Sequence, residues 1–263
     1  FGEQTWEKAE SRMMSMALER ALSKAHLPPS QLGCILGGDL LNQCIGTTFA
    51  LRPTNVPFLG LYGACSTMAE GLLVASCLVE SGFEQTACAI TSSHFCSAER
   101  QYRYPLEYGG QRPQTAQWTA TASGAVVLQK GGMGVRITHA TPGRIADPGV
   151  TSQANMGAAM ALSAYETISR FFQDTHTGPS HYDLIVTGDL GKVGHQIVID
   201  LFQRDGIDMR PTYDDCGLLL YDGSQDVHAG GSGCGCSASV LCSYIMSRLK
   251  QGELNNILFV ATG

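Results

Sequence analysis

The chain has 263 residues, of which 44% are apolar and 15% are charged, and its net charge at neutral pH is −6. This acidic balance argues against nucleic acid as a partner and against attachment to an anionic bilayer through charge alone, and no stretch approaches the roughly 20 apolar residues of a membrane-spanning helix. The length suffices for a sizeable core, and the low charge suits the doubly buried strands of a layered α/β fold.

The first half of the chain predicts alternating helices and strands. An apolar stripe that starts at Trp6 predicts a helix over residues 5–25, which the proline pair at 28–29 ends. The organising stretch is Leu61–Ser93, which predicts a tight turn, a helix and a strand, with Thr67 and Glu70 placed as a capping box. The other predicted elements are strands at 31–38, 56–62, 86–91 and 122–129 and a polar loop at 94–121.

The second half repeats the pattern. The predicted elements are strands at 135–141, 182–188, 217–221 and 256–262, helices at 158–172, 196–204 and 238–250, and a glycine-cysteine turn at 230–237. We interpret the Cys-x-Cys pair in this turn as close packing, because no second Cys/His pair at a suitable spacing supports a metal site.

An ordered series of similar elements indicates an internal duplication. Gly38-Asp39-Leu40 recurs as Gly188-Asp189-Leu190, an offset of 150, and Gly63 in the first turn corresponds to Gly233, an offset of 170. The sequence therefore predicts two halves, residues 1–132 without an opening strand and residues 133–263 without a closing strand.

Cys65 is the first candidate for chemistry, because it stands where the helix of the organising stretch begins. The free N–H groups and the positive end of the helix dipole favour a thiolate there. The position predicts a lowered pKa and either a nucleophile or a member of an anion site. The alternative is that Cys65 is a small buried thiol that does not contact a ligand.

Six motifs together resemble the thiolase superfamily, which includes the ketoacyl synthases, and within it the stage V sporulation AD family of spore-forming bacteria. The motifs are GDLLNQ (38–43), YGACST (62–67), TSSH (91–94), AERQYRYPLEYGGQ (98–111), DDCGLLLY (214–221) and AGGSGCGCSA (229–238). The resemblance implies a thiolase-like α/β fold of duplicated α-β-α-β-α layers. It also implies binding of dipicolinic acid (pyridine-2,6-dicarboxylate) beside a membrane channel of the developing spore.

The same resemblance sets the expected surroundings of the protein. It implies spore membrane channel proteins as partners and a peripheral position at the forespore inner membrane. It also implies a homodimer formed through the strand at 86–91.

The sequence departs from the thiolase pattern at the positions that supply the catalytic groups. A condensing enzyme requires a thiolate and imidazole or amide groups that stabilise the enolate and oxyanion. The strand at 184–187 runs into Gly188-Asp189-Leu190 instead of a histidine, and His228 matches the thiolase histidine only loosely. We therefore expect a binding protein without catalytic residues. The alternative is a condensing enzyme similar to ketoacyl synthase III, with Cys65 as the acyl-accepting nucleophile.

The predicted ligand site gathers strand ends and loops. Its members are Asp39, Asn42, Cys65, His94, Arg103, Asp189, Gly231 and Ser232. An arginine fork matches a carboxylate, although a dimer contact or a solvated loop is the alternative for Arg103. For Asp39 and Asp189 three arrangements stay open beside a dianion: they coordinate Ca²⁺ chelated by dipicolinate, one stays protonated, or both face away and shape loops. We expect no cofactor and no resident metal.

Overall fold

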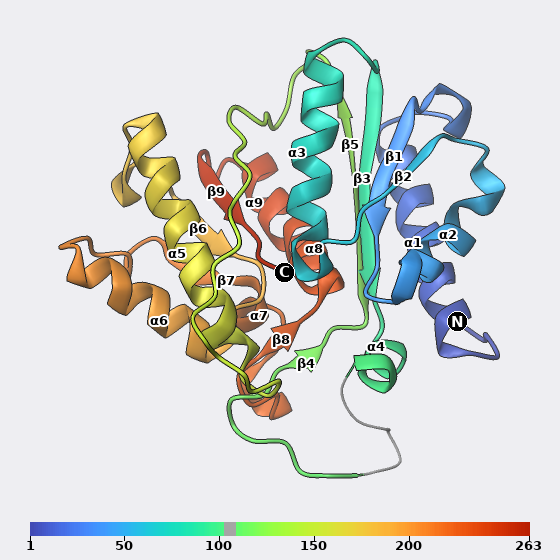
Figure 1. The fold of residues 1–263 in the computed structure, drawn as a ribbon. Coiled ribbons are helices and arrows are strands. Elements are labelled where there is room, and N and C mark those ends of the chain that lie inside the picture. The colour runs from blue at the N-terminus through green and yellow to red at the C-terminus, as the bar shows by residue number, and fades with distance from the viewer. Residues whose placement is uncertain (103–108) are drawn as a thin grey trace.

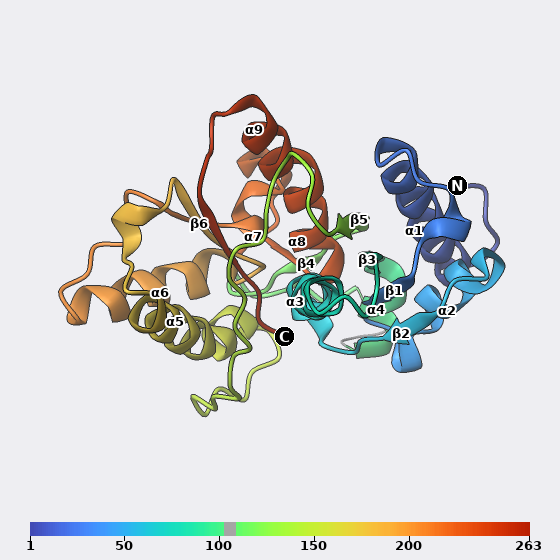
Figure 2. The same cartoon turned by 90° about the horizontal axis from the view of Figure 1, so that it is seen from above.

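The computed structural model describes residues 1–102 and 109–263, and it has five layers. Two sheets alternate with three layers of helices, as the view from above shows most clearly (Figures 1 and 2). The layers confirm the predicted α-β-α-β-α arrangement. One outer layer contains α1 (Trp6–Lys24) and α2 (Ile45–Leu51). The middle layer contains α3 (Thr67–Glu80) and α8 (Cys234–Val240). The other outer layer contains α5 (Met156–Thr175) and α6 (Gly191–Arg204).

The two main sheets share one order and one register. The first has the order β2 (Phe58–Gly60), β1 (Cys34–Gly38), β3 (Thr86–Ser93), β5 (Ala122–Gln129); the second has the order β7 (Tyr213–Asp215), β6 (Leu184–Thr187), β9 (Ile257–Val260). Cys34 pairs with Ala87, and Leu184 pairs with Ile257, at the same offsets of 150 and 170 that the sequence shows. The division at residue 132 stays a prediction.

β3 lies between β1 and β5, so both of its edges are hydrogen-bonded within the sheet. A second chain therefore cannot pair with this strand, and the predicted homodimer stays a prediction that needs another contact. Two further strands, β4 (Trp118–Thr119) and β8 (Gly231–Ser232), form a small parallel sheet between residues of the two halves.

The middle helices share one core with both sheets. Met68 of α3 and Ala89 of β3 pack with Val186 of β6, Ala238 of α8 and the buried Ile245. A single apolar cluster therefore joins the two halves of the chain.

Helix α1 buries a different stripe from the predicted one. The predicted stripe includes Trp6, which is 48% exposed, whereas the buried residues are Glu10, Met14, Leu18 and Leu22. The buried stripe contains a carboxylate, which accepts hydrogen bonds from the hydroxyls of Ser92 (3.0 Å) and Ser97 (2.8 Å). Because Glu10 is charged, a search for apolar residues does not count it as buried. The sequence therefore placed the buried face of the helix on the neighbouring stripe that starts at Trp6.

Two predicted strands are wrong. Residues 135–141 have no strand assignment, and Val135 and Ile137 are about half exposed. Residues 217–221 begin in the short helix α7 (Cys216–Leu219), because the Asp215 side chain caps it by accepting a hydrogen bond from Gly217 N at 2.9 Å. The strand of this region lies just before it, as β7.

The predicted loop at 94–121 contains helix α4 (Phe95–Tyr102) and strand β4, while the predicted Arg103 lies outside the described residues. The predicted helix at 238–250 begins earlier, at Cys234, and continues through a π-helical turn (Leu241–Ile245) into α9 (Met246–Gln251). Within the described ranges, no helix is both long and apolar enough to cross a membrane.

Candidate functional site

Cys65 lies in a single 3₁₀ turn, Ala64–Ser66, that leads from β2 into α3. Ala64 has a left-handed backbone with φ 46°, which is strained for a residue with a side chain. The capping box predicted for this turn is wrong, because the hydroxyl of Thr67 donates to the carbonyl of Ala64 at 2.7 Å. The turn therefore fixes the position of Cys65 through its own backbone.

The surroundings of Cys65 favour a neutral thiol. Its side chain is buried, with 3% exposure for the residue. Burial, followed by the charge of Asp189, raises the pKa of Cys65 well above its ordinary value. The lowered pKa expected from the helix start is therefore wrong, because loss of water outweighs the dipole of the helix.

Asp189 reaches the same place from the second half of the chain. It follows β6, and its Oδ2 accepts hydrogen bonds from Gly233 N (2.8 Å) and from the Ser232 hydroxyl (3.2 Å). Burial raises the pKa of Asp189 to about 6, although these donors and the Cys65 thiol act in the opposite direction. The Cys234 thiol donates to Ala64 O at 3.0 Å, so the glycine-cysteine segment meets the Cys65 turn.

The structure thus brings Cys65, Asp189 and Ser232 together, and Gly231 precedes Ser232 in β8. Asp39 is buried in its own loop, where Leu41 N donates to Oδ1 at 2.9 Å and both the amide and the hydroxyl of Thr47 donate to Oδ2 at 2.6 Å. The Asp39 carboxylate therefore holds the start of α2.

The remaining predicted residues have other partners. The backbone N–H of exposed Asn42 donates to the side chain of Gln101 at 3.4 Å. The His94 ring accepts a hydrogen bond from Cys96 N at 3.2 Å and lies 5.6 Å from the Trp6 ring. Whether these side chains touch a ligand stays a prediction.

Two further imidazoles pack in other surroundings. His228 Nδ1 lies 3.1 Å from Pro113 O, and its ring meets the edge of Trp118 at 6.2 Å. His195 stacks on Tyr213, with ring centroids 4.6 Å apart. The described contacts of these rings therefore place neither of them as a base for the Cys65 thiol.

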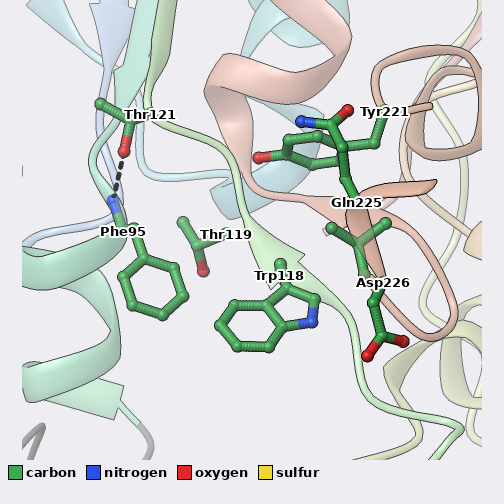
Figure 3. Close-up of a pocket in the computed structure, with 8 residues that line it drawn as sticks. Phe95, Trp118, Thr119, Thr121, Tyr221, Gln225 and Asp226 are labelled. Carbon is green, nitrogen blue, oxygen red and sulfur yellow. Dashed lines mark hydrogen bonds between the residues drawn. The ribbon is translucent and has the colours of Figure 1, made fainter. Parts of the chain in front are cut away.

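An open cavity of about 310 Å³, which the sequence did not indicate, lies beside β4 (Figure 3). Its lining residues come from α4, from β4 and its flank, and from the loop between α7 and β8; they are Phe95, Trp118, Thr119, Thr121, Tyr221, Gln225, Asp226 and Val227. None of the eight is a predicted site residue. The available signal was three aromatic residues: Phe95 and Trp118 in the segment predicted as a loop, and Tyr221 in the segment predicted as a strand.

The aromatic wall of this cavity is rigidly supported. The rings of Phe95 and Trp118 stack with centroids 5.3 Å apart and an angle of 19°. The guanidinium of Arg112 lies 4.5 Å from the Trp118 centroid and pairs with the buried Glu99 carboxylate at 2.8 Å. The Trp118 ring is therefore held by contacts with both the Phe95 ring and the Arg112 guanidinium.

Comparison with known proteins decides the family. A family model described as "Stage V sporulation protein AD (SpoVAD)" matches residues 1–263. The chain belongs to the stage V sporulation protein AD family. Stage V sporulation protein AD from Bacillus subtilis (strain 168) is 48% identical over 261 residues, which cover 99% of this chain and 77% of that relative. The resemblance predicted from the six motifs is confirmed.

Solved structures of other proteins show the fold of this chain. 3-Oxoacyl-[acyl-carrier-protein] synthase III from Aquifex aeolicus VF5 superposes with a TM-score of 0.64 at 16% identity, covering 99% of this chain and 82% of that one. OleA from Xanthomonas campestris, in its E117Q form bound with cerulenin, superposes with a TM-score of 0.64 at 15% identity over 96% of this chain and 76% of its own. This chain therefore has the thiolase fold of these proteins.

Proposed function

We propose that this chain is a non-catalytic binding protein for dipicolinic acid in the machinery that moves this diacid into the forming spore. Membership of a sporulation family supports the setting, and the resemblance in the six motifs supports the ligand. The observation that carries the non-catalytic part is the burial of Cys65 beside the Asp189 carboxylate, which raises the pKa of the thiol.

Acyl transfer by a thiolase-fold enzyme begins with a thiolate attacking a thioester. A neighbouring imidazolium would favour that thiolate, whereas Asp189 and burial disfavour it. His94, His195 and His228 have their described contacts elsewhere. The fold of a condensing enzyme is thus combined with a thiol kept in its unreactive form.

The expected setting follows from the same proposal. The protein attaches peripherally at the forespore inner membrane through the channel proteins of the same system. A homodimer is part of this proposal.

The test is calorimetry of the whole chain with dipicolinic acid, with and without Ca²⁺. Benzene-1,3-dicarboxylate is the matched control, because it keeps both carboxylates and lacks the ring nitrogen. We expect heat of binding with dipicolinic acid and weaker binding of the control. In parallel, intact-mass analysis after incubation with acyl-CoA is expected to show no adduct. No heat under any condition, or an acyl group on Cys65 with a condensed product, contradicts the proposal.

A further inference from the structure

A buried carboxylate joins helix α1 to the start of helix α4. Glu10 lies on the inner face of α1, and its two oxygens accept hydrogen bonds from Ser92 of β3 (3.0 Å) and from Ser97 of α4 (2.8 Å). Helix α4 follows directly at the lower end of β3 in Figure 1. Glu10 therefore connects an outer helix of the fold with the helix that carries Phe95 of the cavity wall.

The titratable groups that face Glu10 carry no positive charge at neutral pH. Asp39 lies before α2, and its charge together with burial raises the pKa of Glu10, burial being the larger cause. Burial lowers the pKa of His94, which lies between β3 and α4, so this ring is neutral. The thiols of Cys88 in β3 and Cys234 in α8 are also neutral, because burial raises the pKa of both.

The arginines of this region have carboxylate partners of their own. Arg100 of α4 pairs with Glu7, and Arg112 pairs with Glu99 at 2.8 Å. Helix α2 and strand β5, which also pack on α1, contain no titratable side chain. Within the described part of the chain, Glu10 thus has two serine hydroxyls as partners and no ion pair. Burial and Asp39 outweigh these donors and raise the pKa of Glu10 to about 7.

The hydroxyl of Ser97 has two acceptors but one proton. Its Oγ lies 2.8 Å from Glu10 Oε2 and 3.1 Å from His94 O, the carbonyl that also accepts from Ala98 N in the first turn of α4. When Glu10 is ionised, the hydroxyl donates to the carboxylate. When Glu10 is protonated, its own O–H donates to Ser97, and Ser97 donates onward to His94 O. Protonation therefore completes a chain of hydrogen bonds from α1 into the first turn of α4.

Helix α4 contacts both regions described above. At its start, the Phe95 ring stacks on Trp118 with centroids 5.3 Å apart, and both line the cavity (Figure 3). At its end, the Tyr102 hydroxyl contacts the hydroxyl of Tyr62, three residues before Cys65. A change in how α4 is held would therefore reach the cavity wall and the approach to the Cys65 turn.

We propose that Glu10 is a proton-dependent latch, which holds α4 against α1 when its carboxyl is protonated and releases the first turn of α4 when it ionises. Release places a buried negative charge near Asp39 and removes the Ser97 hydrogen bond from His94 O. The inference concerns how α4 is held, so it does not depend on which ligand the protein binds.

The sign of the pH dependence follows from the direction of the shift. The pKa of Glu10 is raised from 4.5 to about 7 on folding, so the stability that the latch contributes is complete below pH 4.5 and is lost as the pH rises through about 7. Within the folded state, Glu10 is mostly protonated at pH 6 and mostly ionised at pH 8. We therefore expect a tightly held α4 at pH 6 and a loosened one at pH 8.

The experiment is hydrogen–deuterium exchange of the whole chain at pH 6, 7 and 8, with peptides of α4 compared with peptides of α5. Their ratio cancels the effect of pH on exchange itself. For the wild type we expect the protection of α4 relative to α5 to fall about tenfold from pH 6 to pH 8. In Glu10→Gln the ratio is expected to stay constant, because the amide is always neutral and its N–H donates to Ser97. Glu19→Gln, at an exposed carboxylate on the same helix, is the matched control and should behave as the wild type.

Two further variants test the two ends of the latch. Ser97→Ala removes the connection and is expected to leave α4 weakly protected at both pH 6 and pH 8. In Trp6→Phe, Trp118 is the one remaining tryptophan of the chain, so its fluorescence reports on the contact with Phe95. We expect its emission to change between pH 6 and pH 8, and this change to be absent when Glu10→Gln is added.

A wild-type ratio that is the same at pH 6 and pH 8 overturns the inference, whether or not Glu10→Gln folds. Equal pH dependence in the wild type and in Glu10→Gln also overturns it, because another group then titrates. Protection lost in every peptide at pH 8 contradicts a local release, and constant Trp118 emission contradicts the link to the cavity wall. None of these outcomes bears on the proposed function, which calorimetry tests separately.

Discussion

Cys65 and Asp189 are two groups whose chemistry depends on burial more than on sequence position. A helix start stabilises a charge by about 0.3–1 kcal/mol, whereas taking an ion out of water costs several kcal/mol. The sequence shows the helix start at Cys65 but does not show that the second half of the chain covers it. The direction of the pKa shift was therefore outside the reach of sequence analysis.

The reactivity of Cys65 tests this account. We expect iodoacetamide at pH 7.5 to alkylate Cys65 far more slowly than Cys77, which is exposed on α3 of the same chain. The reason is that burial keeps the Cys65 thiol protonated and shielded from the reagent. Peptide mass spectrometry over a time course measures both rates. Equal rates would show that the site opens readily and that the thiol is available for chemistry.

Asp189 gives a pH-dependent prediction. Its pKa rises from 3.8 when unfolded to about 6 when folded, so the folded state holds the proton more tightly. This contribution to stability is therefore complete below pH 3.8 and is lost as the pH rises to about 6, a change of about 3 kcal/mol. Asp189→Asn cannot titrate, and its oxygen can still accept from Gly233 N.

We expect the free energy of unfolding of Asp189→Asn, relative to the wild type, to increase between pH 4 and pH 6 and to stay level above. Urea unfolding of both proteins at pH 4, 5, 6 and 7.5 measures the difference. A difference that does not vary with pH would mean that Asp189 titrates normally.

At the scale of elements, strands with two covered faces were predictable and exposed connections were not. β3, which is buried from Ala87 to Ser93, matches the predicted strand to within two residues, because its apolar run lies inside the layers; the half-buried β5 matches at both ends. The segment at 135–141 has the same kind of sequence but lacks a strand assignment. Strand formation depends on a partner that pattern alone does not supply. Helix α7 was also not predicted, because its start depends on the Asp215 side chain that caps it.

The contact between β5 and α8 depends on a glycine. A side-chain carbon at Gly124 would lie 2.6 Å from Ala238 O and 2.9 Å from Cys242 Sγ. We expect Gly124→Ala to lower the free energy of unfolding by about 1–3 kcal/mol, because the strand must move away from the helix. Gly178→Ala is the control, since its added carbon meets nothing within 4 Å. Urea unfolding compares the two, and equal stability would mean that this contact yields without cost.

At the scale of the whole molecule, the duplication produces one body with a shared centre. The two sheets repeat their register at the sequence offsets of 150 and 170, and α3 and α8 lie between them (Figure 2). The resemblance in the six motifs implied this layering, and the predicted site grouped Cys65 with Gly231 and Ser232 of the glycine-cysteine segment. The cavity beside β4 was not predictable, because three segments distant in the sequence build it.

The shared core predicts cooperative unfolding. Met68 is fully buried, and it packs in the apolar cluster that joins both halves. We expect Met68→Ala to lower the free energy of unfolding by about 2–5 kcal/mol while tryptophan fluorescence and far-ultraviolet circular dichroism still follow one urea transition. Met133→Ala, at a fully exposed methionine, should change neither midpoint. If the two probes separate in Met68→Ala, the halves unfold independently and the common core does not couple them.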